Sequence, residues 1–387
     1  MAAIGSSTLG VYNPIFYAQE ALIHLENQLG MATRVHRGFD SERSSFGKGD
    51  VINIRKPDTF SAGDAPATAA GVETETVAIT LNKWREVKFA LTDKELALTG
   101  QRIIDDHIAP ATYALANDID SQLCGLWKDV GLNVAHDATA NSGIVANITG
   151  ARKAMLDQGA PVNSGNMHYM MDTTEEQLAL QSSTFAQHQG AGNMGVTTQM
   201  TGSFGNKYGL ECFTNQNVET STAGTHDGAG AIDNGSGYAV GTTTIHVDAL
   251  GQNKTIKIGQ TVEIGDHSYV VTADVTTSDD GQEEADIAIY PGLRVAVADN
   301  DVVTIQSAAK SEMLAFHRNA FALALAPLPE IGNELGAKVA TVTDPKTGLS
   351  IRSRLYYVGN TSQVHVALDV LYGVKTLDPY LACRVQR

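Results

Sequence analysis

A glycine-rich stretch is the first place where residue type and spacing could support chemistry. Gly190, Gly192 and Gly195 match the GxGxxG spacing of dinucleotide-binding loops. Such a loop binds phosphate only where it joins a strand to a helix, because the phosphate lies at the helix N-terminus. Sequence rich in Gln, Ser and His precedes these glycines, and Val-Thr-Thr-Gln follows them. We therefore expect a flexible loop over residues 189–206 and no cofactor.

A cluster of carboxylates between Asp279 and Glu284 is the second candidate. Carboxylate oxygens are ligands that Ca²⁺ prefers, but the cluster lacks the alternating ligand positions of an EF-hand loop. We interpret it as the solvated tip of a hairpin, with a cation site as the alternative.

The eleven histidines include neither HExxH nor a pair with plausible metal-ligand spacing. His136 and His226 each precede an aspartate in a polar segment, which indicates surface turns. His317 is expected on a helix that begins at Ser311, where it contacts a neighbouring element. Neither a GxSxG elbow nor a P-loop occurs. We therefore predict no catalytic, cofactor-binding or metal-binding residue, no cofactor and no enzyme. A hydrolase with an unrecognised site is the alternative.

The chain has 387 residues, with 27 basic and 43 acidic side chains and a formal net charge of −16. Affinity for nucleic acid comes largely from counterion release by Lys and Arg, and these residues are scattered along the chain. We expect a protein that does not grip nucleic acid, although it can form an acidic wall beside it. The other interpretation is that the acidity only aids solubility. The charged fraction of 18% fits a protein that covers much of its surface with neighbours.

Cysteine usage and hydropathy indicate the compartment. The three cysteines are far apart and form no CxxC pair, which argues against a disulfide framework and a zinc site. The first residues lack the charged and apolar regions of a signal peptide. No apolar run approaches the ~20 residues that span a bilayer. We expect a soluble protein made in a reducing cytoplasm.

Helices and an extended arm form the first part of the predicted fold. Apolar stripes predict a helix over 13–30 and a long helix over 110–131, which could serve as a spine of ~30 Å. A capping box at 92–95 opens helical sequence. Two strand patterns, 50–57 and 73–91, are separated by a pliant stretch and predict an extended hairpin. Such an arm has little core of its own, so we expect it to pack on adjacent copies.

The second half shows a change in composition and then short strands. Residues 219–237 contain almost nothing apolar and are expected to form a linker. Turn signals then separate six short β-patterns, which predict a small all-β barrel or sandwich. They cover residues 243–247, 255–258, 261–264, 268–275, 286–290 and 301–305. Helical sequence is expected from Ser311 to Pro327, and strands thereafter, so one α+β body surrounds the β-module.

Three stretches resemble a known family: residues 314–324, residues 369–385, and residues 89–96 followed by 116–120. They are similar to the major coat proteins of tailed bacteriophages, which share the Hong Kong 97 fold. The chain looks most like the short-tailed-phage coat subgroup with an inserted β-barrel domain. The similarity spans nearly the whole chain, although the β-module is short and its sequence has little in common with that subgroup. The Lys–Asn–Glu trio that cross-links some family members has no match in this sequence.

The resemblance implies an α+β fold of the Hong Kong 97 type with an inserted small all-β domain. The implied parts are an N-terminal arm, an extended E-loop hairpin, a spine helix with the peripheral domain, an axial domain, the inserted domain, and a final axial and peripheral part. Their expected boundaries are 1–34, 35–91, 92–139, 140–218, 219–309 and 310–387.

The function that the resemblance implies is that of a major capsid protein, which self-assembles into an icosahedral shell around a double-stranded DNA phage genome. Its partners would be copies of itself in hexamers and pentamers, scaffolding and portal proteins, and DNA enclosed without sequence-specific binding, with no membrane. The virion, assembled in the host bacterial cytoplasm, would be its location. The alternative is a phage decoration, tail or adhesive subunit that binds a ligand through the β-module.

Overall fold

The structure is a computed structural model of the chain. It describes residues 14–37, 51–55, 76–92, 107–139, 142–161, 165–187, 192–226, 228–279, 283–330, 337–343 and 349–387. The chain divides into two compact units. The first unit comprises residues 1–123 and 322–377, and the second comprises residues 124–321 and 378–387. Both units mix helices and strands, so the expected α+β composition is confirmed. Within the described ranges, no helix is long and apolar enough to cross a membrane.

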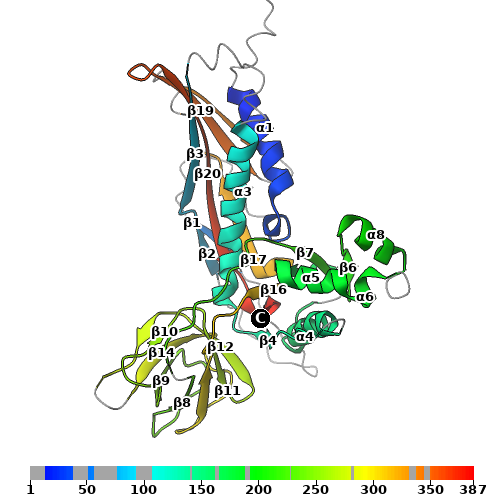
Figure 1. The fold of residues 1–387 in the computed structure, drawn as a ribbon. Helices are drawn as coiled ribbons and strands as arrows, with labels where there is room; N and C mark the ends of the chain where they lie inside the picture. The colour runs from blue at the N-terminus through cyan, green and yellow to red at the C-terminus, as the bar shows by residue number, and fades with distance from the viewer. Residues whose placement is uncertain are drawn as a thin grey trace, which may run out of the picture. The chain divides into compact units, whose positions relative to one another are not determined.

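A five-stranded sheet forms the first unit (Figure 1). Its strands are β3 (Lys83–Thr92), β17 (Phe321–Ala326), β18 (Lys338–Thr343), β19 (Ser350–Val358) and β20 (Gln363–Thr376). Strand β20 pairs antiparallel with β3 and β19, and β18 pairs with β19. Residues 366–370 of β20 are all buried, so burial does not alternate along this stretch. Val366, Leu368 and Val370 still lie on one face, because side chains of a strand alternate between its two faces, and this period of two in the sequence predicted the strand.

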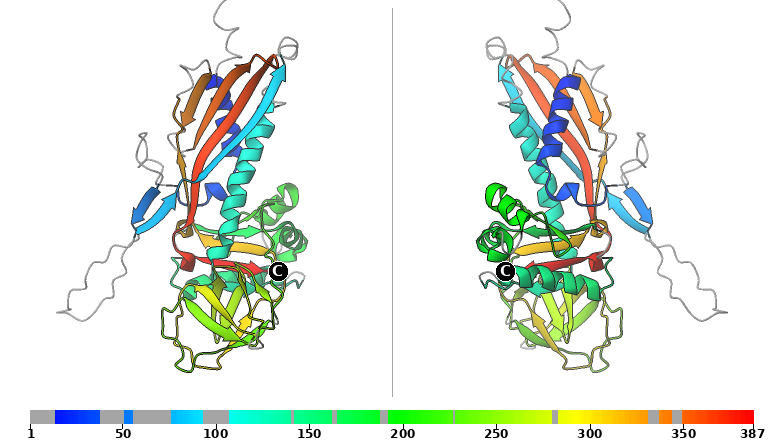
Figure 2. Two further views of the ribbon diagram at one scale, coloured as in Figure 1. Left: turned by 90° about the vertical axis from the view of Figure 1, so that its left-hand side faces the viewer. Right: turned by 90° about the vertical axis from the view of Figure 1, so that its right-hand side faces the viewer.

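Two helices, α1 (Pro14–Gln28) and α3 (Ala109–Cys124), cover one face of this sheet, as both views in Figure 2 show. The carboxylate of Asp120 on α3 accepts hydrogen bonds from the backbone N–H groups of Gly30 (2.6 Å) and Ala32 (3.0 Å). These contacts hold the 3₁₀ turn η3 (Met31–Thr33) against α3. Burial raises the pKa of Asp120, although the backbone N–H groups partly oppose this. Both helices were expected from their apolar stripes.

The described part of the predicted arm is a two-stranded ribbon. Strand β1 (Val51–Arg55) pairs only with β2 (Thr76–Thr80) among the described residues and forms a two-stranded ribbon with it. The chain then enters β3, which belongs to the five-stranded sheet. The second half of the 73–91 pattern therefore pairs with β20 and not with β1. The capping box at 92–95 lies largely outside the described residues.

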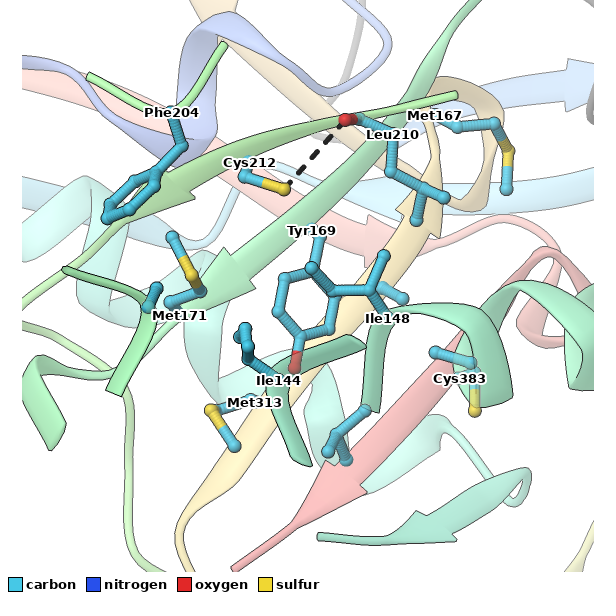
Figure 3. Packing of buried hydrophobic residues seen from close by; sticks show 14 of the residues in the cluster. Ile144, Ile148, Met167, Tyr169, Met171, Phe204, Leu210, Cys212, Met313 and Cys383 are labelled. Atoms are coloured by element: carbon cyan, nitrogen blue, oxygen red, sulfur yellow. Dashed lines mark hydrogen bonds between the residues drawn. The ribbon is translucent and has the colours of Figure 1, made fainter. Parts of the chain in front are cut away.

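The second unit contains a six-stranded sheet in the order β4-β21-β16-β5-β7-β6. Its strands are β4 (Asn133–Ala135), β5 (Met167–Met171), β6 (Asn206–Lys207), β7 (Leu210–Thr214), β16 (Glu312–His317) and β21 (Ala382–Gln386). Its helices are α4 (Gly143–Asp157), α5 (Thr173–Gln181), α6 (Ser183–Ala186) and α8 (Asn193–Thr201), with 3₁₀ helices η6 (Gly125–Asp129), η8 (Arg318–Ala320) and η10 (Pro379–Leu381). Figure 3 shows the core, where Ile144 and Ile148 of α4 lie by Tyr169 of β5.

Two local predictions were wrong. The helix expected from Ser311 is the pair of strands β16 and β17. Strand β16 lies between β21 and β5, and all its residues are buried, so it lacks the alternation that marks a strand with one solvated face. The loop expected at 189–206 contains helix α8. Gly192 (φ +60°) precedes that helix and Gly202 (φ +71°) ends it in the left-handed region, so these glycines mark helix ends.

Six strands form a closed barrel in the order β11-β12-β14-β9-β8-β15, which confirms the predicted small β-module. They are β8 (Ala229–Ile232), β9 (Thr244–Asp248), β11 (Thr261–Ile264), β12 (His267–Val271), β14 (Ala285–Tyr290) and β15 (Val302–Ile305); β10 (Thr255–Ile256) pairs separately with β13 (Val275–Thr276). Residues such as Ile245, Val247 and Ile287 fill its core. Strand β8 lies within 219–237, so that segment is not wholly a linker.

The barrel segment begins and ends at one place on the body. Thr220 and Ser311 form a β-bridge, and the N–H of Ser221 donates to the carbonyl of Lys310 at 2.7 Å. In sequence the barrel strands stand between β7 and β16 of the six-stranded sheet. The chain therefore leaves and re-enters the sheet through two segments joined by this bridge, which we call the neck (residues 219–221 and 310–312).

Candidate functional site

The ribbon of β1 and β2 has one buried and one exposed face. Ile52, Ile54 and Ile79 are buried and pack against three alanines of β17. Val51 on the other face is 42% exposed. We expected the arm to find its packing on adjacent copies, but the base of the ribbon packs on its own chain. In Figure 2 the ribbon extends away from the five-stranded sheet.

A close backbone approach fixes the base of the ribbon. A Cβ atom placed on Gly373 of β20 would lie 2.3 Å from the carbonyl oxygen of Thr80, the last residue of β2. No real Cβ tolerates such a contact, so only glycine permits this spacing. Gly373 therefore determines where the ribbon leaves the sheet.

The sheet face opposite α1 and α3 carries a buried carboxylate and an exposed tryptophan. Cross-strand register places Trp84, Asp369 and Arg352 on the same face of neighbouring strands, because paired residues point to the same side. The Asp369 carboxylate is fully buried and receives Arg352 through two hydrogen bonds of 3.0 and 2.5 Å. The indole N–H of Trp84 donates to Asp369 Oδ2 at 3.0 Å, while the side chain stays 59% exposed.

Further charged side chains continue this strip across β3 and β19. The guanidinium of Arg354 contacts Glu86 Oε2 at 2.6 Å and Asp369 Oδ2 at 3.4 Å. The Lys88 ammonium lies 5.0 Å from the centre of the Tyr356 ring. We call Trp84, Glu86, Lys88, Arg354 and Asp369 the charged strip.

The charged strip has the composition of a protein-binding surface. Tryptophan and arginine are enriched at the centres of such interfaces, where a rigid aromatic side chain loses little entropy on burial. The hydrogen bond to Asp369 already holds Trp84 in one orientation. The strip can therefore offer a preoriented aromatic anchor surrounded by charges that select a complementary partner.

A second polar cluster, within the second unit, joins the barrel to the body. The guanidinium of Arg384 on β21 is fully buried and donates to the carbonyl of Gly259 (2.8 Å) and to Thr261 Oγ1 (2.7 Å). Its Nη1 lies 3.6 Å from the buried carboxylate of Glu312. Burial lowers the pKa of Arg384, and the Glu312 charge opposes that shift. Because the cation and the carboxylate are buried together, neither is left without an opposite charge.

The neighbouring residues complete this junction. The side-chain amide of Gln386 contacts Thr261 Oγ1, Gln306 Oε1 and Glu312 Oε1 at 3.0–3.1 Å. The adjoining cavity has a volume of about 200 Å³. It is below the ~300 Å³ of a small ligand pocket, so the junction is better suited to fixing the barrel than to binding a ligand.

The glycine-rich and acidic stretches form no catalytic arrangement in the described part of the chain. Helix α6 precedes the glycines, and a phosphate loop needs a strand there. Gly190 and residues 280–282 of the acidic stretch lie outside the described residues. Glu284, at the end of that stretch, lies beside His246 of β9.

The histidine interpretations were wrong in three places. The ring of His136 is buried, and its Nε2 lies 2.5 Å from Glu175 Oε2. His226 is 5% exposed and hydrogen-bonds to the barrel residue Gln306, so neither histidine is a surface turn. His317 is buried on strand β16, not on a helix, and burial lowers its pKa. Each is held by a residue or strand distant in sequence.

The three cysteines are buried, and none of them is part of a disulfide. Burial raises the pKa of Cys212 and of Cys383 to about 12. A thiol needs a depressed pKa to act as a nucleophile, so these two are not suited to that role. Sequence reasoning missed the charged strip and the junction, because only the alternating β3 pattern pointed to Trp84 and nothing local pointed to Arg384.

No family model and no curated protein matches the chain. Solved structures from phage particles are similar to it. A structure of Mycobacterium phage Che8 has 13% identity and a TM-score of 0.49, with 92% of this chain and 90% of that chain covered. The mature capsid of bacteriophage PhiM1 gives 11% identity and a TM-score of 0.41, with 87% and 81% covered.

A virus-like particle from Pyrococcus furiosus has 8% identity and a TM-score of 0.42, with 95% of this chain and 97% of that chain covered. Because these TM-scores lie below 0.5, we draw no residue role from the similarities.

Proposed function

We propose that this chain is a major capsid protein of the Hong Kong 97 type that assembles with copies of itself into an icosahedral shell around a double-stranded DNA phage genome. It is a structural protein and not an enzyme. The similarity of residues 314–324 and 369–385 to phage coat proteins supports this class. In the proposal, hexamers and pentamers form the lattice, scaffolding and portal proteins assist assembly in the host bacterial cytoplasm, and the protein resides in the virion.

The observation that carries the proposal is the exposed Trp84 on the charged strip. An indole that is 59% exposed, yet fixed by a hydrogen bond to a buried carboxylate, is preorganised for contact with another protein surface. Arg354 and Glu86 beside it provide both signs of charge. In a shell every subunit repeats such a contact, so a modest interaction per site becomes a stable particle.

The ribbon of β1 and β2 is the second feature that supports assembly. A two-stranded ribbon is marginally stable alone, and unpaired strand edges pair readily with other chains. In the part of the chain that the structure describes, β1 and β2 pair only with each other. Val51 is exposed on its outer face. We assign the ribbon to the base of the proposed extended arm, residues 35–91.

The charge of the chain suits a container for DNA better than a DNA-binding protein. A net charge of −16 gives little counterion release on contact with phosphates. We propose that DNA is enclosed without sequence-specific binding and is mildly repelled by the wall. A strongly basic inner surface in an assembled particle would contradict this part of the proposal.

Negative-stain microscopy and sedimentation velocity of the expressed chain test the assignment, alone and with the proteins encoded beside its gene. We expect uniform hollow particles in at least one condition. In the same experiment Trp84→Ala should lower the particle yield, while Val302→Ala, which removes an exposed apolar side chain of the barrel, should not. Monodisperse monomers in both conditions would contradict the capsid assignment.

The alternative is a phage decoration, tail or adhesive subunit that binds its ligand through the barrel. Exposed apolar side chains on the barrel, Val240 (64%) and Val302 (65%), are the observation in its favour. That function predicts a monomer or small closed oligomer. It also reverses the outcome for the two variants, because Val302→Ala would then weaken binding and Trp84→Ala would not.

A further inference from the structure

Three side chains that can bind a metal ion converge on the outside of the barrel, in a region that the proposed function does not use. They are Asp233, His246 and Glu284, and their ligand atoms all lie within 4.8 Å of one another. His246 Nε2 is 3.3 Å from Glu284 Oε2. Two ligands bound at ~2.1 Å in a tetrahedral zinc site are about 3.4 Å apart, so this pair already has the required separation.

The backbone holds these three residues in place. Asp233 follows β8, His246 lies within β9, and Glu284 precedes β14, and these are neighbouring strands of the closed barrel. The buried residues on either side of His246 point into the barrel, so its ring points outward. The backbone of His246 is held by two hydrogen bonds. Its N–H donates to the hydroxyl of Tyr238 at 3.0 Å, and its carbonyl accepts from the N–H of Asp233.

A fourth residue selects which imidazole nitrogen faces the carboxylates. Asp286, the cross-strand partner of His246, lies 2.7 Å from Nδ1. A proton held on Nδ1 leaves the Nε2 lone pair directed at Glu284. This carboxylate–histidine pair is the arrangement by which proteins orient a metal-binding imidazole. One nitrogen lone pair and two carboxylates then face one another, and only a positive charge between them relieves their repulsion.

We propose that Asp233, His246 and Glu284 bind one divalent transition-metal ion of the zinc class, with water completing its coordination. One imidazole and two carboxylates form a mixed nitrogen and oxygen ligand set, which suits Zn²⁺ better than Ca²⁺ or Mg²⁺. The ion would link three strands of the barrel near one end. Its role is structural, because it joins the segment after β8 to the start of β14.

A proton is the competing occupant of Nε2. The carboxylates of Asp286 and Glu284 accept hydrogen bonds from the His246 ring and raise its pKa, and burial opposes this shift. A protonated ring could bridge the two carboxylates without any metal. A metal titration distinguishes the two occupants, because a site held by the proton alone binds no Zn²⁺. The titration is best made at pH 8, where the proton competes weakly.

Isothermal titration of the intact chain with ZnCl₂ tests the site, with thermal unfolding in the presence and absence of Zn²⁺ as a second readout. We expect one Zn²⁺ per chain and a rise in Tm on binding. His246→Gln should abolish this site, Asp233→Asn should weaken binding at least tenfold, and Asp286→Asn should weaken it about tenfold through loss of orientation. His267→Gln and Asp266→Asn are matched controls on the same barrel and should change neither readout.

Circular dichroism of each variant shows whether the barrel is folded, and the exposed Asp233 gives a variant with little risk to folding. Binding that is unchanged in both His246→Gln and Asp233→Asn would overturn the proposal. So would an absence of Zn²⁺ binding to the intact chain, which would leave the protonated histidine bridge as the function of these residues. A stronger response to Ca²⁺ than to Zn²⁺ would overturn the choice of metal.

Discussion

The barrel and the β1–β2 ribbon differ in whether the edges of their strands are paired. Each of the six barrel strands has a neighbour on both sides, so closure leaves no edge for another chain. Within the described residues, β1 and β2 pair only with each other. The barrel can therefore be stable without partners, whereas the ribbon and the charged strip beside it are features that a partner could complete.

The same contrast appears in the placement of charge. At the barrel junction Arg384 and Glu312 are both fully buried and are satisfied inside the chain. On the charged strip, Asp369 is buried but Trp84 remains exposed above it. Buried polar residues thus fix the barrel to the body, while the strip keeps part of its contact surface open.

We expect the largest loss of stability from a substitution that disrupts the barrel junction. Arg384→Met leaves the buried Glu312 carboxylate without its cation, and we expect a loss of about 3–5 kcal/mol in the free energy of unfolding. Urea denaturation measures it. Arg318→Met, on an exposed side chain, is the control and should change stability by less than about 0.5 kcal/mol. Adding Glu312→Gln to Arg384→Met should recover part of the loss; an unchanged urea midpoint in Arg384→Met would disprove the role of the pair.

Removing the aromatic anchor should affect assembly more than folding. Trp84→Ala deletes an exposed side chain from the charged strip, and we expect about 2 kcal/mol less binding free energy per contact. Because 1.4 kcal/mol is a factor of ten, each contact weakens by more than tenfold. Light scattering against protein concentration gives the threshold for assembly. Should Val302→Ala shift that threshold as much as Trp84→Ala, the distinction between barrel and strip would fail.

A methyl group at Gly373 should disturb the base of the ribbon. The Cβ of Gly373→Ala would meet the carbonyl oxygen of Thr80, a backbone atom, so β2 or β20 has to shift. We expect a cost of about 1–3 kcal/mol in thermal unfolding. Gly359→Ala is the matched control, because nothing lies within 4 Å of its Cβ position. Equal Tm values for the two variants would show that the close approach has no energetic importance.

The smallest effect concerns pH and the second unit. Burial raises the pKa of Asp172, but the N–H of Glu175 and the guanidinium of Arg387 outweigh it, so the pKa lies below its ordinary value of 3.8. A lowered pKa in the folded state stabilises the protein above pH ~3.8, and this contribution disappears as the pH falls further. Asp172→Asn should cost a few tenths to about 1 kcal/mol at pH 7 and nothing near pH 2. Equilibrium unfolding from pH 2 to 7 measures it, and a constant difference would contradict the assignment.

Local sequence patterns predicted the helices and strands that have one buried face and one solvent-exposed face. Helix α1 has one buried stripe that contains Ala18, Leu22 and Leu25, and the barrel strands alternate between core and solvent. Each pattern reflects its own period of 3.6 or 2 residues. Strand β16 could not be predicted in this way, because it is buried on both faces and its apolar residues fit a helix equally well.

The functional contacts were largely beyond sequence reasoning, because they join residues far apart in the chain. His136 and Glu175 are 39 residues apart, and Arg384 and Gly259 are 125 apart. The sequence near His136 or Arg384 gives no indication of the residue that each contacts. The charged strip became visible only when the strand register placed Trp84 opposite Leu371 and within hydrogen-bond distance of Asp369.

The neck has a consequence for how such a protein could change over generations. Because Thr220 and Ser311 are bridged, the segment between them can be exchanged by recombination as a cassette without rethreading the sheet that flanks it. A foreign domain whose termini are close together could occupy the same place for display. Any replacement domain must also provide a hydrogen-bond acceptor for the buried Arg384 guanidinium. Otherwise Arg384 has to be substituted together with the barrel.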